Sequence, residues 1–161
     1  MTACAYNYHE NLIGDSIEIR MTNEFIPYES YRVRGRESYE ILNHEQRHFD
    51  ISEIYVRRVR EYITKWKGSN KEDYNAYLLS GTENIYHDSL AIHYESETTH
   101  DLNHQNQEKW NRKIDSLLKN YARFNKTVFR LHWPSTSSDF FGSPYIAYST
   151  AHKLIIDTRD K

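Results

Sequence analysis

Two histidines and a glutamate with the spacing of a zinc site lie in the run His-Glu-Gln-Arg-His, from His44 to His48. On a helix, residues four apart project from the same side, so His44 and His48 can point both imidazoles at one ion. Zinc prefers such nitrogen ligands, in a tetrahedral arrangement with bonds of about 2.0–2.1 Å. Glu45 lies about 100° further round the helix, where it can reach a water bound to the ion. The run predicts a zinc site with its general base; the alternative is a polar helix face.

A third ligand must come from elsewhere, and the stretch from His93 to Gln105 is the obvious source. Four of its residues are spaced by four, three and four positions and would share one face of a continuous helix: His93, Glu97, His100 and His104. Only one of them is needed, so at least two are ordinary surface residues. The segment between the two regions is long enough to form a helical hairpin that brings them together.

The elements that must position these residues can be read from hydrophobic spacing. Residues 37–66 contain no Gly or Pro and carry apolar residues at helical intervals, which predicts one long helix over 37–66 with Gly68 as its C-terminal cap. Further helices are predicted over 71–99, with a break or kink at Gly81, and over 105–124. Alternating or apolar runs predict strands over 16–21, 25–33, 127–133 and 151–158, and a loop over 134–144. Because Pro27 cannot donate to a ladder, the second strand is expected at an edge. Strands, then helices, then strands predict an α+β domain.

Composition limits the class of partner. Lys and Arg total 21 against 23 Asp and Glu, so there is no electrostatic case for nucleic acid or an anionic membrane. Cys4 is the only cysteine, which excludes an intrachain disulfide and leaves His, Asp and Glu as metal ligands. No apolar run is long enough to span a membrane, and the first residues lack the pattern of a signal peptide. We expect a chain that is cytoplasmic as written, or in the cell envelope or secreted if a signal was removed.

Two blocks of the sequence resemble a bacterial family of zinc-dependent proteases, known chiefly as a domain of unknown function. "ILNHEQRHFDISEIYVRRVR" resembles the family's His-Glu-Gln-x-His-Phe-Asp-Ile run. "YESETTHDLNHQNQEKW" resembles its Tyr-Asp-x-x-Thr-x-His segment with the Gln-x-x-Trp that follows. The blocks occur in the family's order within residues 42–118. The matched positions of the second block are Tyr94, Thr98, His100, Gln107 and Trp110, with Glu95 and Asp101 as departures from the family's usual Asp and Gly or Ser.

The resemblance implies a single zincin-like metalloprotease domain over 1–161. Its expected architecture is a long HExxH helix, a helical hairpin and a small peripheral antiparallel sheet. The implied ligands of Zn²⁺ are His44, His48 and His100, with Glu97 open as the alternative to His100. Glu45 would act as general base toward a zinc-bound water in the hydrolysis of a peptide or protein substrate.

Three nearby residues have candidate supporting roles. Tyr94 could share the negative charge of the attacked carbonyl, although packing beside the metal helix is the stronger interpretation. Asp50 and Glu53 could orient a ligand imidazole, with a plain surface role favoured for Glu53.

Two other interpretations stay open. A fourth protein ligand such as Glu97 or His104 would close the coordination sphere and make the zinc structural in a binding protein. The third interpretation is a metal-free interaction module, suggested by the fourteen tyrosines.

Overall fold

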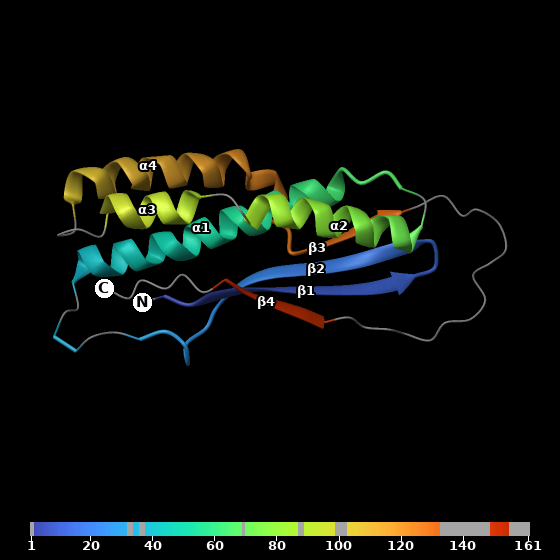
Figure 1. Ribbon diagram of the computed structural model, residues 1–161, viewed down its shortest axis with the longest axis horizontal. Coiled ribbons are helices and arrows are strands. Elements are labelled where there is room, and N and C mark those ends of the chain that lie inside the picture. Colours follow the sequence, from blue (N-terminus) through green and yellow to red (C-terminus); the bar gives the residue numbers. More distant parts are fainter. Residues whose placement is uncertain are drawn as a thin grey trace.

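The computed structural model describes residues 2–31, 34–35, 38–68, 70–86, 89–98, 103–132 and 149–154. These residues form an α+β fold with a long central helix between a sheet and further helices (Figure 1). In chain order the elements are β1 (Cys4–Ile13), β2 (Ser16–Phe25), α1 (Tyr39–Thr64), α2 (Lys71–Tyr86), α3 (Leu90–Thr98), α4 (His104–Asn120), the short 3-10 helix η2 (Ala122–Phe124), β3 (Val128–His132) and β4 (Ser149–Leu154).

The sheet has the strand order β3-β2-β1-β4, and every neighbouring pair is antiparallel. β1 and β2 form a hairpin whose register runs from the pair of Cys4 and Phe25 to the pair of Ile13 and Ser16. Gly14 in its two-residue turn has a φ of 59°, a left-handed conformation that such turns require and that glycine adopts without a steric penalty. The hairpin therefore sets which residues of both strands face the helices.

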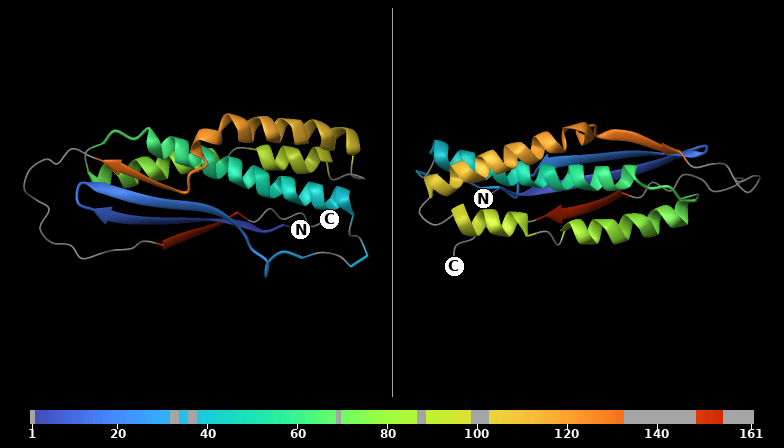
Figure 2. Two further views of the ribbon diagram at one scale, coloured as in Figure 1. Left: turned by 180° about the vertical axis from the view of Figure 1, so that it is seen from behind. Right: turned by 90° about the horizontal axis from the view of Figure 1, so that it is seen from above.

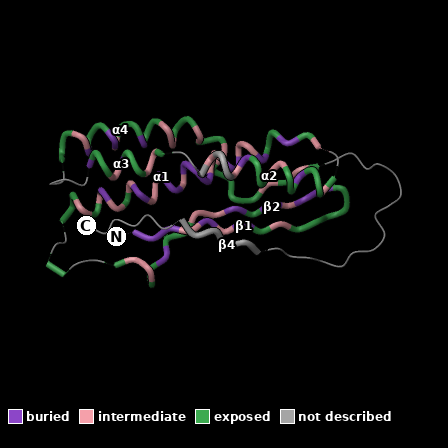
Figure 3. Tube along the Cα trace, viewed as in Figure 1, coloured by how far each residue is buried: buried purple, intermediate pink, exposed green. Residues whose placement is uncertain are grey.

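Helix α1 is buried on two sides, because it packs on the sheet along one part and on helices along another (Figures 2 and 3). One core cluster joins Val56, Val59 and Ile63 of α1 to inward residues of the hairpin, among them Ile17 and Ile19. The second cluster joins other apolar residues of α1 to α3 and α4: Ile51, Ile54 and Tyr55 with Tyr94, Trp110 and Ile114. The expected α+β fold with a small antiparallel sheet is confirmed, and the sheet supplies one wall of the first core cluster.

The predicted long helix is confirmed. α1 begins after Ser38, whose side chain accepts a hydrogen bond from the backbone N–H of Ile41, as an N-cap residue does. It ends at Thr64, within two residues of the predicted end. The third predicted helix is also present, as α4 followed by η2.

Other predictions of the elements are wrong. The single helix expected over 71–99 is two helices, and Gly81 lies inside α2 and does not end it. The strand expected over 25–33 is absent from its described part, because Phe25 is the last residue of β2 and the residues directly after it form a turn. β1 was not predicted at all. The loop expected over 134–144 lies outside the described residues.

Among the described helices, none is both long enough and apolar enough to cross a membrane.

Candidate metal centre

Three side chains from two helices converge on one point. His44 and His48 lie one turn apart on the buried side of α1, and Glu95 reaches them from α3. The Nε2 atoms of the two histidines are 3.2 Å apart. Glu95 Oε2 lies 2.9 Å from Nε2 of His48 and 3.4 Å from Nε2 of His44. The predicted pair of histidines therefore shares one focus, with a carboxylate beside it.

The separations between these three atoms suit a zinc ion. A tetrahedral site with bonds of about 2.0–2.1 Å places its ligand atoms about 3.3–3.4 Å from one another. The three observed distances, from 2.9 to 3.4 Å, are close to that range. Two imidazole nitrogens and one carboxylate oxygen are also a ligand set that catalytic zinc sites use. His44, His48 and Glu95 therefore fit zinc in both chemistry and spacing.

Tyr94 fixes the distance between the two helices that supply the ligands. Its ring is fully buried, stacks on His44 with centroids 5.0 Å apart, and meets His48 edge-on at 4.8 Å. Trp110 of α4 packs against the other part of the same ring, at 5.5 Å. The hydroxyl donates a hydrogen bond to the backbone carbonyl of His44 at 3.0 Å. Because Tyr94 directly precedes Glu95, this packing also sets where the carboxylate lies.

Tyr94 contacts the side of His44 that faces away from the cluster. Its hydroxyl is 3.1 Å from Nδ1, whereas Nε2 is the nitrogen that faces Glu95. Burial raises the pKa of the phenol above its ordinary value, so the hydroxyl keeps its hydrogen at neutral pH. These contacts support the packing interpretation of Tyr94 over a role beside the reacting carbonyl.

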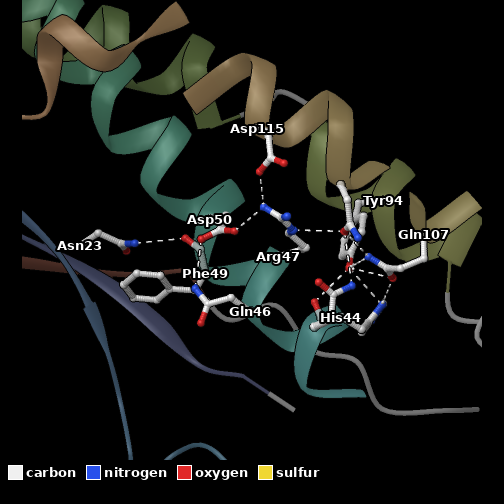
Figure 4. A network of polar contacts seen from close by, with 11 residues as sticks. Asn23, His44, Gln46, Arg47, Phe49, Asp50, Tyr94, Gln107 and Asp115 are labelled. Atoms are coloured by element: carbon white, nitrogen blue, oxygen red, sulfur yellow. Dashed lines mark hydrogen bonds and ion pairs between the residues drawn. The ribbon is translucent and has the colours of Figure 1, made fainter. Parts of the chain in front are cut away.

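A polar shell surrounds Nδ1 of His44 (Figure 4). Besides Tyr94, Gln107 Oε1 lies 3.2 Å and Thr98 Oγ1 3.3 Å from this nitrogen. Gln107 belongs to α4 and Thr98 to α3, and both are buried. Three of the five matched positions of the second sequence block, Tyr94, Thr98 and Gln107, thus meet at one ligand imidazole.

Glu45 lies on the part of α1 that faces the start of β1. It is partly buried, and burial acts to raise its pKa. The net effect is the opposite, because the causes that lower it include a hydrogen bond from Thr2 and the positive charge available at His48. The carboxyl pKa is therefore held below its ordinary value and Glu45 is ionised at neutral pH, as a general base must be.

The other candidates for the third ligand do not face the cluster where they are described. Glu97 is exposed and accepts a hydrogen bond from Trp110 Nε1 at 2.9 Å. His93 and His104 are exposed as well. His104 lines a cavity of about 170 Å³ at the N-terminal ends of α1 and α4, together with Tyr39, Glu40, Asn43, Gln107 and Glu108. Gln107 links this cavity to the centre, because it also contacts His44.

Asp50 and Glu53 pair with arginines and not with a ligand imidazole. Asp50 accepts from Arg47 at 3.0 Å, and Glu53 accepts from Arg57 at 2.8 Å. Glu53 also lies 3.2 Å from Arg60. The orienting role weighed for these two carboxylates is therefore not supported by the described contacts.

The implied third ligand, His100, lies outside the described residues, as does Asp101. The residue that sequence reasoning missed is Glu95, since the search for a shared helix face selected His93 and Glu97 on either side of it. One signal was present: the position keeps a carboxylate, Glu for the usual Asp of the resembling family.

Comparison of the chain with family models, with curated proteins and with solved structures finds no match. The family resemblance of the two sequence blocks therefore stays a prediction. What the chain does must be argued from its own residues.

Proposed function

We propose that this protein is a zinc-dependent hydrolase of peptide bonds with a zincin-like centre. His44 and His48 would hold the metal through Nε2, and Glu95 through one carboxylate oxygen. The observation that carries the proposal is the convergence of these three atoms from α1 and α3, all within 3.4 Å of one another. Glu45, which lies on α1 with the two histidines, supplies the ionised carboxylate that the reaction needs.

The roles of the protein groups follow from their chemistry. When bound, zinc supplies a Lewis acid that polarises the peptide carbonyl and makes water acidic enough to attack near neutral pH. Glu45 takes the proton from the attacking water and passes it to the departing amine. Its lowered pKa keeps it ready to accept that proton. Glu95 offsets part of the positive charge of the ion, and the buried histidines exclude water from the far side of the centre.

Replacing Glu45 tests the catalytic role apart from the metal site. Because the amide of Glu45→Gln cannot accept the proton, we expect peptide hydrolysis to fall by about 100-fold or more, in line with the usual contribution of a general base. Zinc should remain at one per chain, since Glu45 is not a ligand. Cleavage of a mixed fluorogenic peptide library and metal analysis of the same preparation give the two readouts. Glu61→Gln, on the same helix and paired with Lys65 instead, is the matched control.

Two outcomes of that experiment would overturn the catalytic proposal. One is a Glu45→Gln variant that hydrolyses peptides as fast as the unchanged protein. The other is an unchanged protein that holds one zinc and cleaves no peptide of the library, which would favour the alternative of a structural metal in a binding protein.

A further inference from the structure

We infer that Arg47, Asn111 and Gln107 form a directional hydrogen-bond relay that holds the proton of His44 on Nδ1. Its effect is to turn the lone pair of His44 Nε2 toward His48 and Glu95. The use of that lone pair as a zinc ligand rests on the proposed function, but the relay itself is a property of the metal-free protein. Its three members are positioning residues, because none of them touches the cluster of ligand atoms.

The relay starts at Arg47, which can only donate hydrogen bonds. Its Nε lies 3.1 Å from the side-chain oxygen of Asn111 (Figure 4 shows the setting of Arg47). A guanidinium has five N–H donors and no acceptor, so the Asn111 atom that faces it must be the oxygen and not the nitrogen. Nη1 of the same guanidinium donates to Asp50 at 3.0 Å and to Asp115 at 2.6 Å, and these two ion pairs hold it in place.

The orientation of Asn111 then fixes the amide of Gln107. The Asn111 oxygen accepts a hydrogen bond from Gln107 Nε2 at 2.9 Å. The same nitrogen donates to the hydroxyl oxygen of Tyr94 at 3.0 Å. Turning the Gln107 amide over would set oxygen against oxygen at Asn111, which burial makes costly. Gln107 Oε1 therefore faces His44 Nδ1, at 3.2 Å.

The two hydroxyl groups near His44 have their hydrogens engaged elsewhere. Thr98 donates to the backbone carbonyl of Tyr94 at 2.6 Å. The single hydrogen of the Tyr94 hydroxyl has two acceptors besides Nδ1, the backbone carbonyl of His44 at 3.0 Å and Gln107 Oε1 at 3.2 Å. With Gln107 Oε1, all three neighbours of Nδ1 then present oxygen lone pairs to it. A neutral imidazole carries a single N–H, so His44 must carry it on Nδ1. Nε2 is left as an acceptor. His48 Nε2 lies 3.2 Å from it and 2.9 Å from Glu95 Oε2, so one N–H of His48 faces both acceptors.

His48 lacks a comparable arrangement. Its Nδ1 is buried and has no hydrogen-bond partner among the described residues. Metal-binding histidines usually donate their second ring N–H to an acceptor, and loss of that acceptor typically lowers metal affinity by about 10–100-fold. The relay therefore fixes the tautomer of His44 before the metal arrives, whereas no described contact at Nδ1 does so for His48.

Long-range ¹H–¹⁵N correlation spectra of the metal-free protein test the relay, because they show which ring nitrogen of each histidine carries hydrogen. We expect hydrogen on Nδ1 of His44 in the unchanged chain. Gln107→Leu and Asn111→Leu should each move His44 toward the Nε2–H form, and Gln107→Leu should weaken zinc binding by about 10–100-fold. Asn111→Asp keeps an oxygen between Arg47 and Gln107 and should restore the Nδ1–H form. Gln105→Leu, an exposed position of the same helix, is the matched control.

The inference is overturned if His44 of the unchanged metal-free protein carries hydrogen on Nε2. It is also overturned if folded Gln107→Leu or Asn111→Leu protein keeps hydrogen on Nδ1. If circular dichroism shows that Gln107→Leu does not fold, the tautomer measured in Asn111→Leu tests the inference, because Asn111 is only half-buried. A chain that shows the predicted tautomer but binds no zinc would remove the proposed function and leave the relay standing.

Discussion

Glu95 is the candidate ligand at which the centre meets solvent. Its side chain is 24 % exposed, compared with 8 % for His44 and none for His48. A hydrolytic centre needs access for water and for the peptide, and both histidines are closed off by Tyr94 and by their own helix. We therefore expect a substrate to approach along α3, on the side of Glu95, and not across α1.

Cys4 offers a residue-scale test of the buried region beside Glu45. Burial, together with the negative charge of Glu45, raises the pKa of this thiol to about 11. A rise of about two units from an ordinary thiol pKa lowers the reactive thiolate fraction by about 100-fold at mildly alkaline pH. Alkylation of the native protein by iodoacetamide, followed by mass spectrometry, should be slower than alkylation in concentrated guanidinium by at least that factor. Equal rates in the two conditions would show that Cys4 is not buried as described.

At the residue scale, the sequence predicted correctly those contacts that depend only on the local geometry of a helix. His44 and His48 share a helix face wherever they occur on a helix, so their proximity needed no tertiary information. Glu95 could not be selected in the same way. The face of α3 that turns toward α1 is set by the burial of Tyr94 and Thr98, which is a tertiary property.

At the scale of elements, α1 and α2 are joined by a reciprocal pair of tyrosines. Tyr62 and Tyr77 stack with centroids 4.1 Å apart, and each hydroxyl donates to the backbone carbonyl of the other residue. Gly81 makes room for this pair, because a Cβ there would lie 1.9 Å from the ring of Tyr62. The glycine that suggested a helix break is therefore a packing position inside α2.

Substitution of Gly81 measures that contact. In Gly81→Ala the added methyl group must displace a ring held by stacking and two hydrogen bonds, which should lower the free energy of unfolding by about 1–3 kcal/mol. Urea denaturation followed by circular dichroism gives the value. Asn75→Ala, exposed on the same helix, should change it by no more than about 0.5 kcal/mol. If Gly81→Ala were as stable as the unchanged protein, the described packing of α2 on α1 would be wrong.

The elements show why some boundaries were predictable and others were not. α1 and α4 carry long apolar stripes without interruption, and both were predicted within a few residues. α2 ends at Tyr86 and α3 begins at Leu90, and the sequence between them contains neither Gly nor Pro to signal a helix end. β1 alternates correctly, but its inward residues include Cys4, Tyr6 and Tyr8 and not aliphatic side chains. Because the buried positions of β1 carry aromatic and thiol side chains, the strand was not predicted from aliphatic alternation.

At the scale of the whole molecule, the candidate centre lies where separate parts of the fold meet. Its ligands come from α1 and α3, its polar shell includes α4, and its proposed base faces β1. A bound ion would join α1 directly to α3, in addition to the second core cluster and the hydrogen bond of Tyr94 to the backbone of His44. The α+β class follows from the order of the elements along the chain. The meeting of four elements at one point does not follow from that order, because it depends on the packing of α1 against both core clusters.

Zinc titration of the metal-free protein tests the central claim most directly, with Glu95→Gln and His100→Ala measured beside the unchanged chain. The account predicts one tightly bound zinc per chain and a large loss of affinity in Glu95→Gln, because the amide offers a weaker, uncharged ligand to the metal. His100→Ala should bind as tightly as the unchanged chain. An unchanged chain that binds no zinc would contradict the account, and full affinity in Glu95→Gln with loss in His100→Ala would contradict its choice of third ligand.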